Sequence, residues 1–575
     1  MKQTLWVLVF CATLTACASH KVDPDQSFDA LANRIWQDAE NIGRTNNNEL
    51  PDMSPEAYLK ANQQFKQLLA ELNAVDVQSL SEQHQINHTI LRYRLQNQVD
   101  EYTYGDRYMP LTAESGFHSD ILFQLSGNQF KTAEDVEKYL TKLSSLPRYM
   151  AQQTAWMRQG IAKGYTQPKA VLAGYEQGIL SFIQKDIEKS VFFRPLRKAV
   201  STIPADQWQT LQQRARTIIT EQIHPAYQQY YDFFVGEYLP AARDTIAASA
   251  LPDGANFYQN RLEYYTTLKM TPAEVHQIGL NEVARIRAEM ATVIAQTGFQ
   301  GSFAEFIQFL RTDKQFYATT PDQLLREAAF LSKKIDAQLP KLFHTLPRTP
   351  YGVEAVPAEI APKYTTGRYS GGREPGDAGF YWVNTYALDR RPLYEMEALT
   401  LHEAVPGHHL QVALANEQTN LPSYRRSFYT SAFGEGWGLY AEYLGLEVGF
   451  YQDPYSNFGR LTYEMWRACR LVVDTGMHTM GWSRQQAIDF LASNTALSMH
   501  NVTTEVDRYI SWPAQALSYK LGEITIKRLR ADAEQALGDK FDVRQFHDVV
   551  LQNGSLPLPV LEQQVAKYIR QQQSK

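Results

Sequence analysis

Cysteine is scarce in this chain, with three among 575 residues. Cys11 and Cys17 lie close to the start, and Cys469 stands alone in the remainder. If a leader is removed before a lipidated Cys17, no pair of thiols is left to form an intrachain disulfide, even in an oxidising compartment. A chain of this length can bury enough apolar surface to fold without such a cross-link.

Long apolar runs are also absent. The run at residues 5–14 is too short to cross a bilayer, and no later run reaches about 18 apolar residues, so we expect a soluble body. The sequence LTAC at residues 14–17 is a bacterial lipobox, which predicts a signal peptide over residues 1–16 and lipidation of Cys17. The next residue is Ala18 rather than Asp, which favours a lipid anchor in the outer membrane of a Gram-negative bacterium, facing the periplasm. The alternative is an ordinary secretory peptide that contains a cysteine by chance.

The chain has no surplus of basic residues, since its net charge is −6, and this argues against nucleic acid as a partner. Strand-like runs are few, and repeats or Gly/Ser linkers are lacking. Helix starts are frequent: Thr132, Thr271 and Thr320 each precede an acidic or amide residue three positions later, as in N-terminal capping boxes. We predict a mainly α protein with a helical N-terminal region, 17–270, and a helical metal-binding catalytic region, 271–575, or one continuous domain. The sequence leaves the oligomeric state open.

Residues 402–409, HEAVPGHH, carry the strongest chemical signal. Two imidazoles can hold a metal ion, and Glu403 beside the first can take a proton from water. On a straight helix, His408 would lie about 9 Å along the axis and about 240° around from His402, too far for one ion. Pro406 lacks the N–H that would bond to His402, and Gly407 tolerates unusual dihedral angles, so we predict that the helix bulges or restarts between the histidines. The alternative is a helix that ends at Pro406, with the later histidines in a loop.

A second segment, residues 433–442, reads as an apolar helix with three glycines at alternate positions. Glycine weakens a helix by about 1 kcal/mol relative to alanine, so close approach to the metal helix is the expected reason for them. Glu435 and Glu442 share one face but lie about 10.5 Å apart along the axis, so one ion can take only one of them. We predict Glu435 as the third metal ligand and Glu442 as the residue that orients a histidine N–H.

These motifs, HEAVPGHHLQ, GEGWGLYAE and the later DTGMH at residues 474–478, resemble a family of bacterial lipoproteins known as domain of unknown function 885. The resemblance is strongest over residues 364–530. That family is similar to the gluzincin metallopeptidases, which implies a large multi-helix architecture with a small antiparallel β element beside the active-site helix, and one Zn²⁺ per chain. In a related peptidase group the motif is lengthened with glycine before the second histidine, which favours His408 over His409 as ligand. His409 then lies behind the ligands.

The segments ahead of the metal helix are candidates for substrate binding. Residues 379–386 read as a strand, and in gluzincins an edge strand at this place hydrogen-bonds the substrate backbone. Asn384 would add a side-chain contact. In the loop at residues 367–376, Arg373 or Arg368 would hold a substrate carboxylate. The ordinary alternatives are a core strand and solvated loop arginines.

Stabilisation of the negative charge that develops during peptide hydrolysis needs a hydroxyl or an imidazole N–H. We nominate His478, Tyr509 and Tyr519 for this role. Asp474 and Gln515 would equally serve as structural hydrogen-bond partners.

Taken together, the residues predict a periplasmic zinc metallopeptidase that cuts short peptides, with Glu403 activating a zinc-bound water. Two alternatives stay open: a lipid-anchored binding or scaffold protein with a degenerate metal site, and a metal-dependent amidase acting on cell-wall stem peptides. The presence of Glu403 favours catalysis, because a binding protein has no use for a base beside the metal. The sequence does not decide between exopeptidase and endopeptidase activity or exclude other divalent metals.

Overall fold

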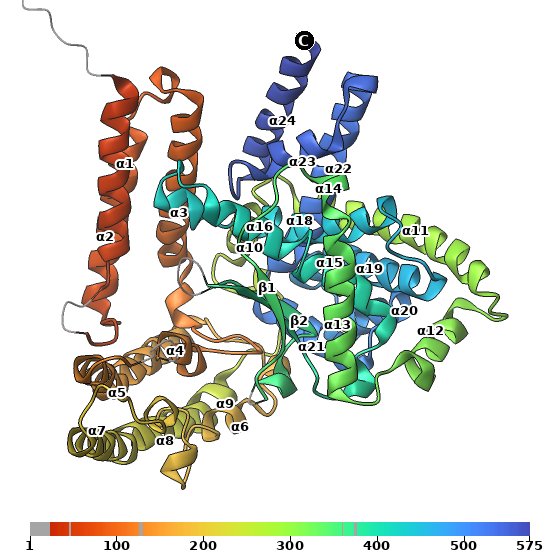
Figure 1. Ribbon diagram of the computed structural model, residues 1–575. Helices are drawn as coiled ribbons and strands as arrows, with labels where there is room; N and C mark the ends of the chain where they lie inside the picture. The colour runs from red at the N-terminus through yellow and green to blue at the C-terminus, as the bar shows by residue number, and fades with distance from the viewer. Residues whose placement is uncertain (1–22, 45–47, 126–129, 359, 373–376) are drawn as a thin grey trace, which may run out of the picture.

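The computed structural model describes residues 23–44, 48–125, 130–358, 360–372 and 377–575. Three helices stand side by side at one edge of the molecule (Figure 1). They are α1 (Pro24–Asn41), α2 (Pro55–Asn73) and α3 (Glu82–Tyr104). Below them lies a second group of helices (Figure 1). It contains α4 (Phe117–Leu125), α5 (Ala133–Lys163), α6 (Tyr175–Leu180), α7 (Ala205–Ile218), α8 (His224–Phe233) and α9 (Leu239–Ala241).

The remaining helices pack around a small sheet near the middle of the molecule (Figure 1). Those that precede the metal motif are α10 (Gly254–Thr266), α11 (Pro272–Thr297), α12 (Phe303–Thr312), α13 (Pro321–Asp336) and α14 (Leu339–Leu342). Those that carry the motifs and follow them are α15 (Met396–Glu403), α16 (His408–Glu417), α17 (Ser423–Arg426), α18 (Ser431–Glu447), α19 (Pro454–Thr479), α20 (Arg484–Asn494), α21 (Met499–Ser511), α22 (Ser518–Leu537), α23 (Val543–Leu551) and α24 (Leu558–Gln573). The prediction of a mainly α protein is confirmed.

Helix starts follow the capping signals. Thr132 and Thr271 form full capping boxes at α5 and α11, and Gly298, at φ 72°, ends α11. Thr320 accepts the backbone N–H of Gln323 at the start of α13, but the Gln323 side chain accepts from Thr319 instead of closing the box. The largest buried apolar cluster runs from Leu50 to Tyr568 and so includes residues on both sides of residue 270. Among the described residues, no helix combines the length and the apolar composition that a bilayer crossing requires.

The sheet has three strands in the order β1 (Tyr351–Ala355), β3 (Gly379–Val383), β2 (Gly367–Ser370). β2 is antiparallel to β3 as expected, but β1 is parallel to it, so the sheet is mixed. β3 is the central strand. The prediction that this strand is an edge strand for the substrate backbone is therefore wrong, because its hydrogen-bonding edges are taken by β1 and β2.

The helix restarts between the two histidines, as predicted. α15 ends at Glu403 and α16 begins at His408. A side chain at Gly407 would overlap the carbonyl oxygen of His402, so the tight connection accepts only glycine there. The indole of Trp437 in α18 donates to the carbonyl of Pro406 at 2.8 Å and ties the connection to that helix.

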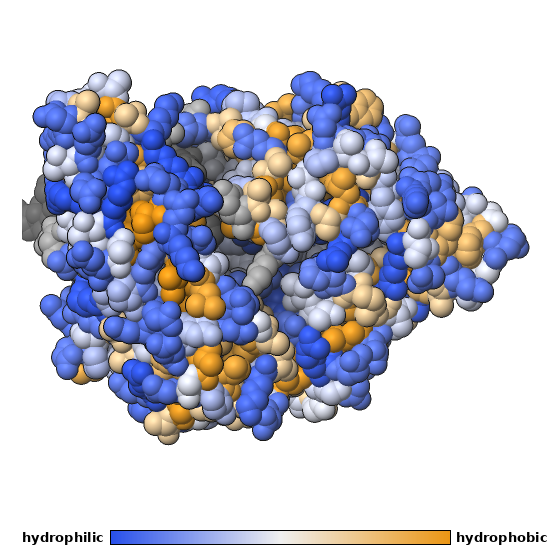
Figure 2. Space-filling model, turned by 90° about the horizontal axis from the view of Figure 1, so that it is seen from below, coloured by the Kyte–Doolittle hydropathy of each residue, from blue (hydrophilic) through white to orange (hydrophobic). Residues whose placement is uncertain are grey.

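The face of the molecule seen in Figure 2 is hollowed near its middle. The α18 helix crosses α22 at two glycines, since an added Cβ at Gly436 would lie 2.6 Å from the Cα of Gly522. These two backbones therefore touch without side chains between them.

We expect Gly522→Ala to lower the free energy of unfolding by about 1–3 kcal/mol, because the new methyl group would overlap the carbonyl oxygen of Ala432 and force α18 and α22 apart. Gly236→Ala is the matched control, since nothing lies within 4 Å of its added Cβ. That control should raise stability slightly, by about 0.5–1 kcal/mol. Urea denaturation measures both, and equal effects of the two substitutions would contradict this close helix contact.

Candidate metal centre

His402 lies at the end of α15, and 2% of its surface is exposed. Its Nδ1 lies 2.7 Å from Oε1 of Glu442 on α18. Because a carboxylate only accepts hydrogen bonds, this contact places a ring proton on Nδ1 and leaves Nε2 as the nitrogen that a metal ion could take. The Nε2 atom faces Oε2 of Glu435 at 3.4 Å. Glu442 therefore aims His402 at Glu435.

His408 completes the cluster from the first position of α16. Its Nε2 lies 3.3 Å from the same Oε2 of Glu435. One donor atom each from His402, His408 and Glu435 lies within 4.8 Å of the others, and this is the one such group of potential ligands within the described residues. Donors on a tetrahedral zinc ion lie roughly 3.3 Å apart, given bonds of about 2.0–2.2 Å. The three side chains match a metal site with small adjustments.

Charge and exposure agree with a cation at this point. Desolvation lowers the pKa of His402, but Glu435, Glu442 and Glu403 raise it more, to about 10. Desolvation raises the pKa of Glu435, but His408 and His402 lower it more, so it lies well below the usual carboxyl range. The exposed fraction of the side chain is 3% for His402 and 17% for Glu435, so one side of the cluster meets solvent.

Of the four glycines of α18, the three in the predicted segment, at residues 434, 436 and 438, each have a packing reason, and one of these three faces α15, the helix that carries His402. A Cβ at Gly438 would lie 2.7 Å from Cε1 of His402, so the imidazole occupies the space of a missing side chain. Gly436 makes room for α22, and Gly434 makes room for the ring of Tyr429. Thus the prediction of close approach to the metal helix holds for Gly438 alone.

Glu403 stands beside the cluster. Its Oε2 accepts the backbone N–H of Tyr369 in β2 at 2.7 Å, and its surface is 8% exposed. His409 lies further back, with Nδ1 3.1 Å from the Tyr369 hydroxyl and Nε2 3.0 Å from the Thr349 carbonyl. Burial lowers the pKa of His409 to about 4. Both of its nitrogens are occupied, so it supports β2 rather than the metal ligands.

Of the three nominated charge stabilisers, His478 does not face the cluster. It is fully buried, its Nδ1 accepts the Ala248 N–H at 3.0 Å, and its Nε2 lies 3.0 Å from the Tyr509 carbonyl. Burial lowers the pKa of His478 to about 4, which keeps the ring neutral. Because both nitrogens hold backbone groups, the role nominated for His478 does not suit its position.

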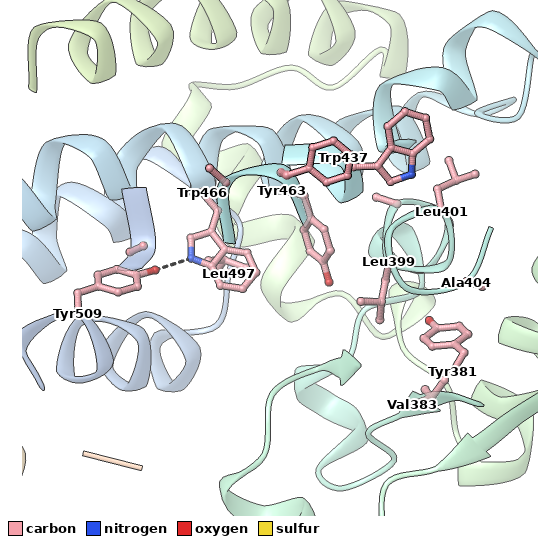
Figure 3. Close-up of a cluster of buried hydrophobic side chains, with 14 of the residues drawn as sticks. Tyr381, Val383, Leu399, Leu401, Ala404, Trp437, Tyr463, Trp466, Leu497 and Tyr509 are labelled. Atoms are coloured by element: carbon pink, nitrogen blue, oxygen red, sulfur yellow. Dashed lines mark hydrogen bonds between the residues drawn. The ribbon is translucent and has the colours of Figure 1, made fainter. Parts of the chain in front are cut away.

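Tyr509 is also a buried structural residue. Its hydroxyl accepts from the indole of Trp466 at 2.8 Å (Figure 3) and from Nε of Arg470 at 2.9 Å. Tyr519 differs, since it is only partly buried and its ring lies under Arg470, with 4.3 Å from Cζ to the ring centroid. Burial, and then Glu435 and Tyr519, raise the pKa of Tyr429. Of the three candidates, Tyr519 is the one with an electrostatic effect on a neighbour of Glu435.

The structure does not support the predicted contact between Asn384 and a substrate. Its side chain is fully buried, donates to the carbonyls of Ala361, Tyr364 and Thr365, and accepts the Tyr386 N–H. It shapes the turn before β2. Arg373 and Cys17 lie outside the described residues.

Two neighbours of the cluster were missed from the sequence. The Tyr429 hydroxyl donates to Oε1 of Glu435 at 3.2 Å, and Nη2 of Arg467 lies 3.6 Å from Oε1 of Glu442. Their positions could not be read from spacing, since Tyr429 precedes its helix and Arg467 comes from α19. The only indication in the sequence was that an aromatic residue, Tyr429, stands just before the helix that carries Glu435.

The comparisons with known proteins agree on the fold. The model of the family described as "Bacterial protein of unknown function (DUF885)" matches residues 37–565. A crystal structure of a candidate lipoprotein from Colwellia psychrerythraea is 28% identical, with a TM-score of 0.87 over 95% of this chain and 99% of that one. A structure of a candidate lipoprotein of unknown function from Shewanella oneidensis is 18% identical, with a TM-score of 0.70 over 93% and 99% of the two chains, and it shows the fold alone. No curated protein matches the chain.

The two carboxylates of α18 should differ in their effect on metal binding. We expect Glu435→Ala to abolish tight zinc binding, because its oxygen is the one that both imidazoles face. Glu442→Ala should weaken zinc binding by about 10–100-fold, because it only orients His402. Competition with a chromophoric chelator measures both affinities, with Glu562→Ala, an exposed residue paired with Arg528, as the control. The reverse order of the two effects would show that the ligand assignment is wrong.

Proposed function

The chain belongs to the bacterial family of unknown function DUF885, and because that family carries no assigned activity, we propose one from the site: a zinc-dependent peptidase for short peptides. The observation that carries this proposal is the convergence of His402, His408 and Glu435, with Glu403 beside them and outside the ligand group. A metal helix with His-Glu and a later His, plus a Glu from a second helix, is the arrangement of gluzincin metallopeptidases. The proposal rests on the similarity between these metal-binding side chains and the neighbouring carboxylate and those of gluzincins.

Two imidazoles and a carboxylate are a ligand set that suits zinc and leaves a fourth position open for substrate or water. Zinc in such a site supplies Lewis acidity, which polarises a carbonyl group and lowers the pKa of water. The protein's contribution is to fix the donors, and Glu442 does so by holding the ring of His402.

Glu403 is the proposed general base. It follows His402 directly in the chain, so it is placed at the edge of the same cluster. The Tyr369 N–H holds one of its oxygens at 2.7 Å, which leaves the other to accept a proton from the attacking water. A carboxylate that takes the proton can then deliver it to the leaving amine.

The oxygen of the scissile carbonyl gains negative charge during attack and needs a donor. Tyr519 and Tyr429 are the two tyrosines that we consider for this role. Tyr429 is 47% exposed and already donates to Glu435, so its hydroxyl lies at the ligand itself. We assign charge stabilisation to Tyr519, with Tyr429 placing the Glu435 carboxylate.

We propose that the protein is anchored to the outer membrane by a lipid on Cys17 and acts in the periplasm. The lipobox at residues 14–17 supports this, and the Colwellia and Shewanella proteins are described as candidate lipoproteins. A peptidase tethered there would meet short peptides released near the cell wall.

The test of the proposed function is Glu403→Gln, which keeps size and hydrogen bonding but removes the basic group. We expect zinc content and thermal stability to be retained, and hydrolysis of quenched fluorogenic peptides to fall by at least about 100-fold. Unchanged turnover would refute Glu403 as the base. Zinc binding without hydrolysis of any peptide by the native protein would favour a binding protein, and cleavage confined to cell-wall stem peptides would favour the amidase.

A further inference from the structure

Arg368 lies close to the metal cluster, and its guanidinium forms no ion pair with the described residues. It lies in β2 immediately before Tyr369, whose backbone N–H binds Glu403. Side chains alternate along a strand, so Arg368 projects from the face opposite to Tyr369, toward Tyr364, with 5.7 Å from Cζ to that ring. The residue is exposed at the surface, and it forms no ion pair with a carboxylate of the described residues, although Glu403 and Glu435 are near enough to raise its pKa. Its guanidinium can therefore take an anionic ligand.

Arg508 of α21 approaches the cluster from another side. Its Nη2 donates to Oε1 of Gln515 at 2.7 Å, and Nε2 of Gln515 donates to Oγ of Ser431 at 3.2 Å. Ser431 lies one turn before Glu435 on α18, and residues so spaced have Cβ atoms about 5–6 Å apart. The guanidinium of Arg508 is therefore anchored to the helix turn that carries the metal ligand.

The charges around Arg508 do not balance. Oε2 of Glu505 lies 3.3 Å from Nη1 of Arg508 and 3.0 Å from Nη2 of Arg470, so one carboxylate serves two guanidinium groups. Nη1 of Arg470 has no hydrogen-bond partner although the residue is 2% exposed. Burial raises the pKa of Glu114, and Arg508, Arg368 and Arg470 lower it, so Glu114 is a second carboxylate beside these guanidinium groups. Three guanidinium groups thus face two carboxylates, and the surplus positive charge favours a single anionic ligand.

Tyr519 lies within electrostatic reach of both arginines. Burial lowers the pKa of Arg368, but Tyr364, Glu403 and Tyr519 raise it more. Burial also lowers the pKa of Arg508, but Glu505, Tyr519 and Glu114 raise it more. Both guanidinium groups thus stay charged beside one tyrosine.

We propose that Arg368 and Arg508 form a carboxylate subsite that binds the free C-terminus of a peptide, so that the proposed peptidase acts as a carboxypeptidase. This inference rests on the proposed function. A planar guanidinium matches a carboxylate with two parallel hydrogen bonds, which gives direction as well as affinity. Trp512, which is 38% exposed and lies 5.6 Å from Cζ of Arg508, offers an apolar surface for the last side chain of the peptide.

The test measures binding rather than turnover. The zinc-loaded Glu403→Gln variant is titrated with tetra-alanine, with tetra-alanine amide, and with Ala-Ala-Glu-Ala amide. Loss of charge-assisted hydrogen bonds costs about 1.5–3 kcal/mol, so we expect the free acid to bind at least about 10-fold more tightly than tetra-alanine amide. The glutamate peptide should bind like the amide, which separates a C-terminal carboxylate from a side-chain one.

Substitutions assign this preference to the arginines. Arg508→Met and Arg368→Met, each in the Glu403→Gln background, should each reduce the preference for the acid to less than about 3-fold. Arg508→Lys keeps the charge but loses the planar fork, so it should leave an intermediate preference and covers the case in which the methionine variant does not fold. Arg326→Met, at a side chain 81% exposed and paired with Asp322, is the matched control and should change nothing.

Equal binding of acid and amide, or no binding of either at millimolar concentration, would overturn the subsite. So would tight binding of the glutamate peptide, which would assign the arginines to an acidic side chain. None of these results would contradict zinc binding or the loss of hydrolysis in the Glu403→Gln variant, so the proposed function would stand. Conversely, a protein that binds no zinc yet prefers the acid would refute the peptidase and leave the carboxylate subsite standing.

Discussion

The imidazole of His402 lies over Gly438, and its Nδ1 is held by Glu442 one helical turn further along α18. This contact joins α15, which carries His402, to α18, which carries Glu435. It sets where Nε2 of His402 points, and therefore where Glu435 and His408 must lie to share the proposed ion. A side chain larger than hydrogen at position 438 would fill the space of the ring, so the contact depends on glycine at that position.

The position of α18 is in turn fixed by its neighbours. Gly436 and Gly522 bring α18 and α22 into backbone contact, and Trp437 holds the connection before His408 through the Pro406 carbonyl. α19 packs against both helices, and every residue from Phe458 to His478 is buried. Its residue Glu464 is paired with Lys520 and Arg460, because an unpaired buried charge would be costly. Arg467 from this helix reaches Glu442. The position of the site thus depends on close glycine contacts, on a hydrogen bond from an indole to the backbone, and on ion pairs of α19.

Local signals in the sequence were sufficient for part of this architecture. The caps at Thr132 and Thr271 and the helix restart at Pro406 and Gly407 depend on dihedral angles and hydrogen bonds of neighbouring residues, and the structure has them as expected. Helical spacing likewise separated the roles of Glu435 and Glu442, since only one of two carboxylates so far apart can face the histidines.

Pairings between distant segments could not be read in the same way. The sequence of residues 379–383 does not indicate that β1 and β2 pair with both sides of this strand, so the central strand was predicted to be an edge strand. An asparagine or a histidine can line a substrate cleft or lie in a core. Only the folded structure shows that the side chains of Asn384 and His478 form hydrogen bonds with backbone groups. Arg508 reaches α18 through Gln515, a contact that no periodicity indicates.

The central claim is that one metal ion is held by His402, His408 and Glu435. Anomalous diffraction at the zinc edge, on crystals of metal-replete protein, tests it most directly. We expect one peak per chain, about 2.0–2.2 Å from Nε2 of each histidine and from a carboxylate oxygen of Glu435. No peak at His402, or a peak bound by His409 or Glu442 in place of His408 or Glu435, would contradict the account.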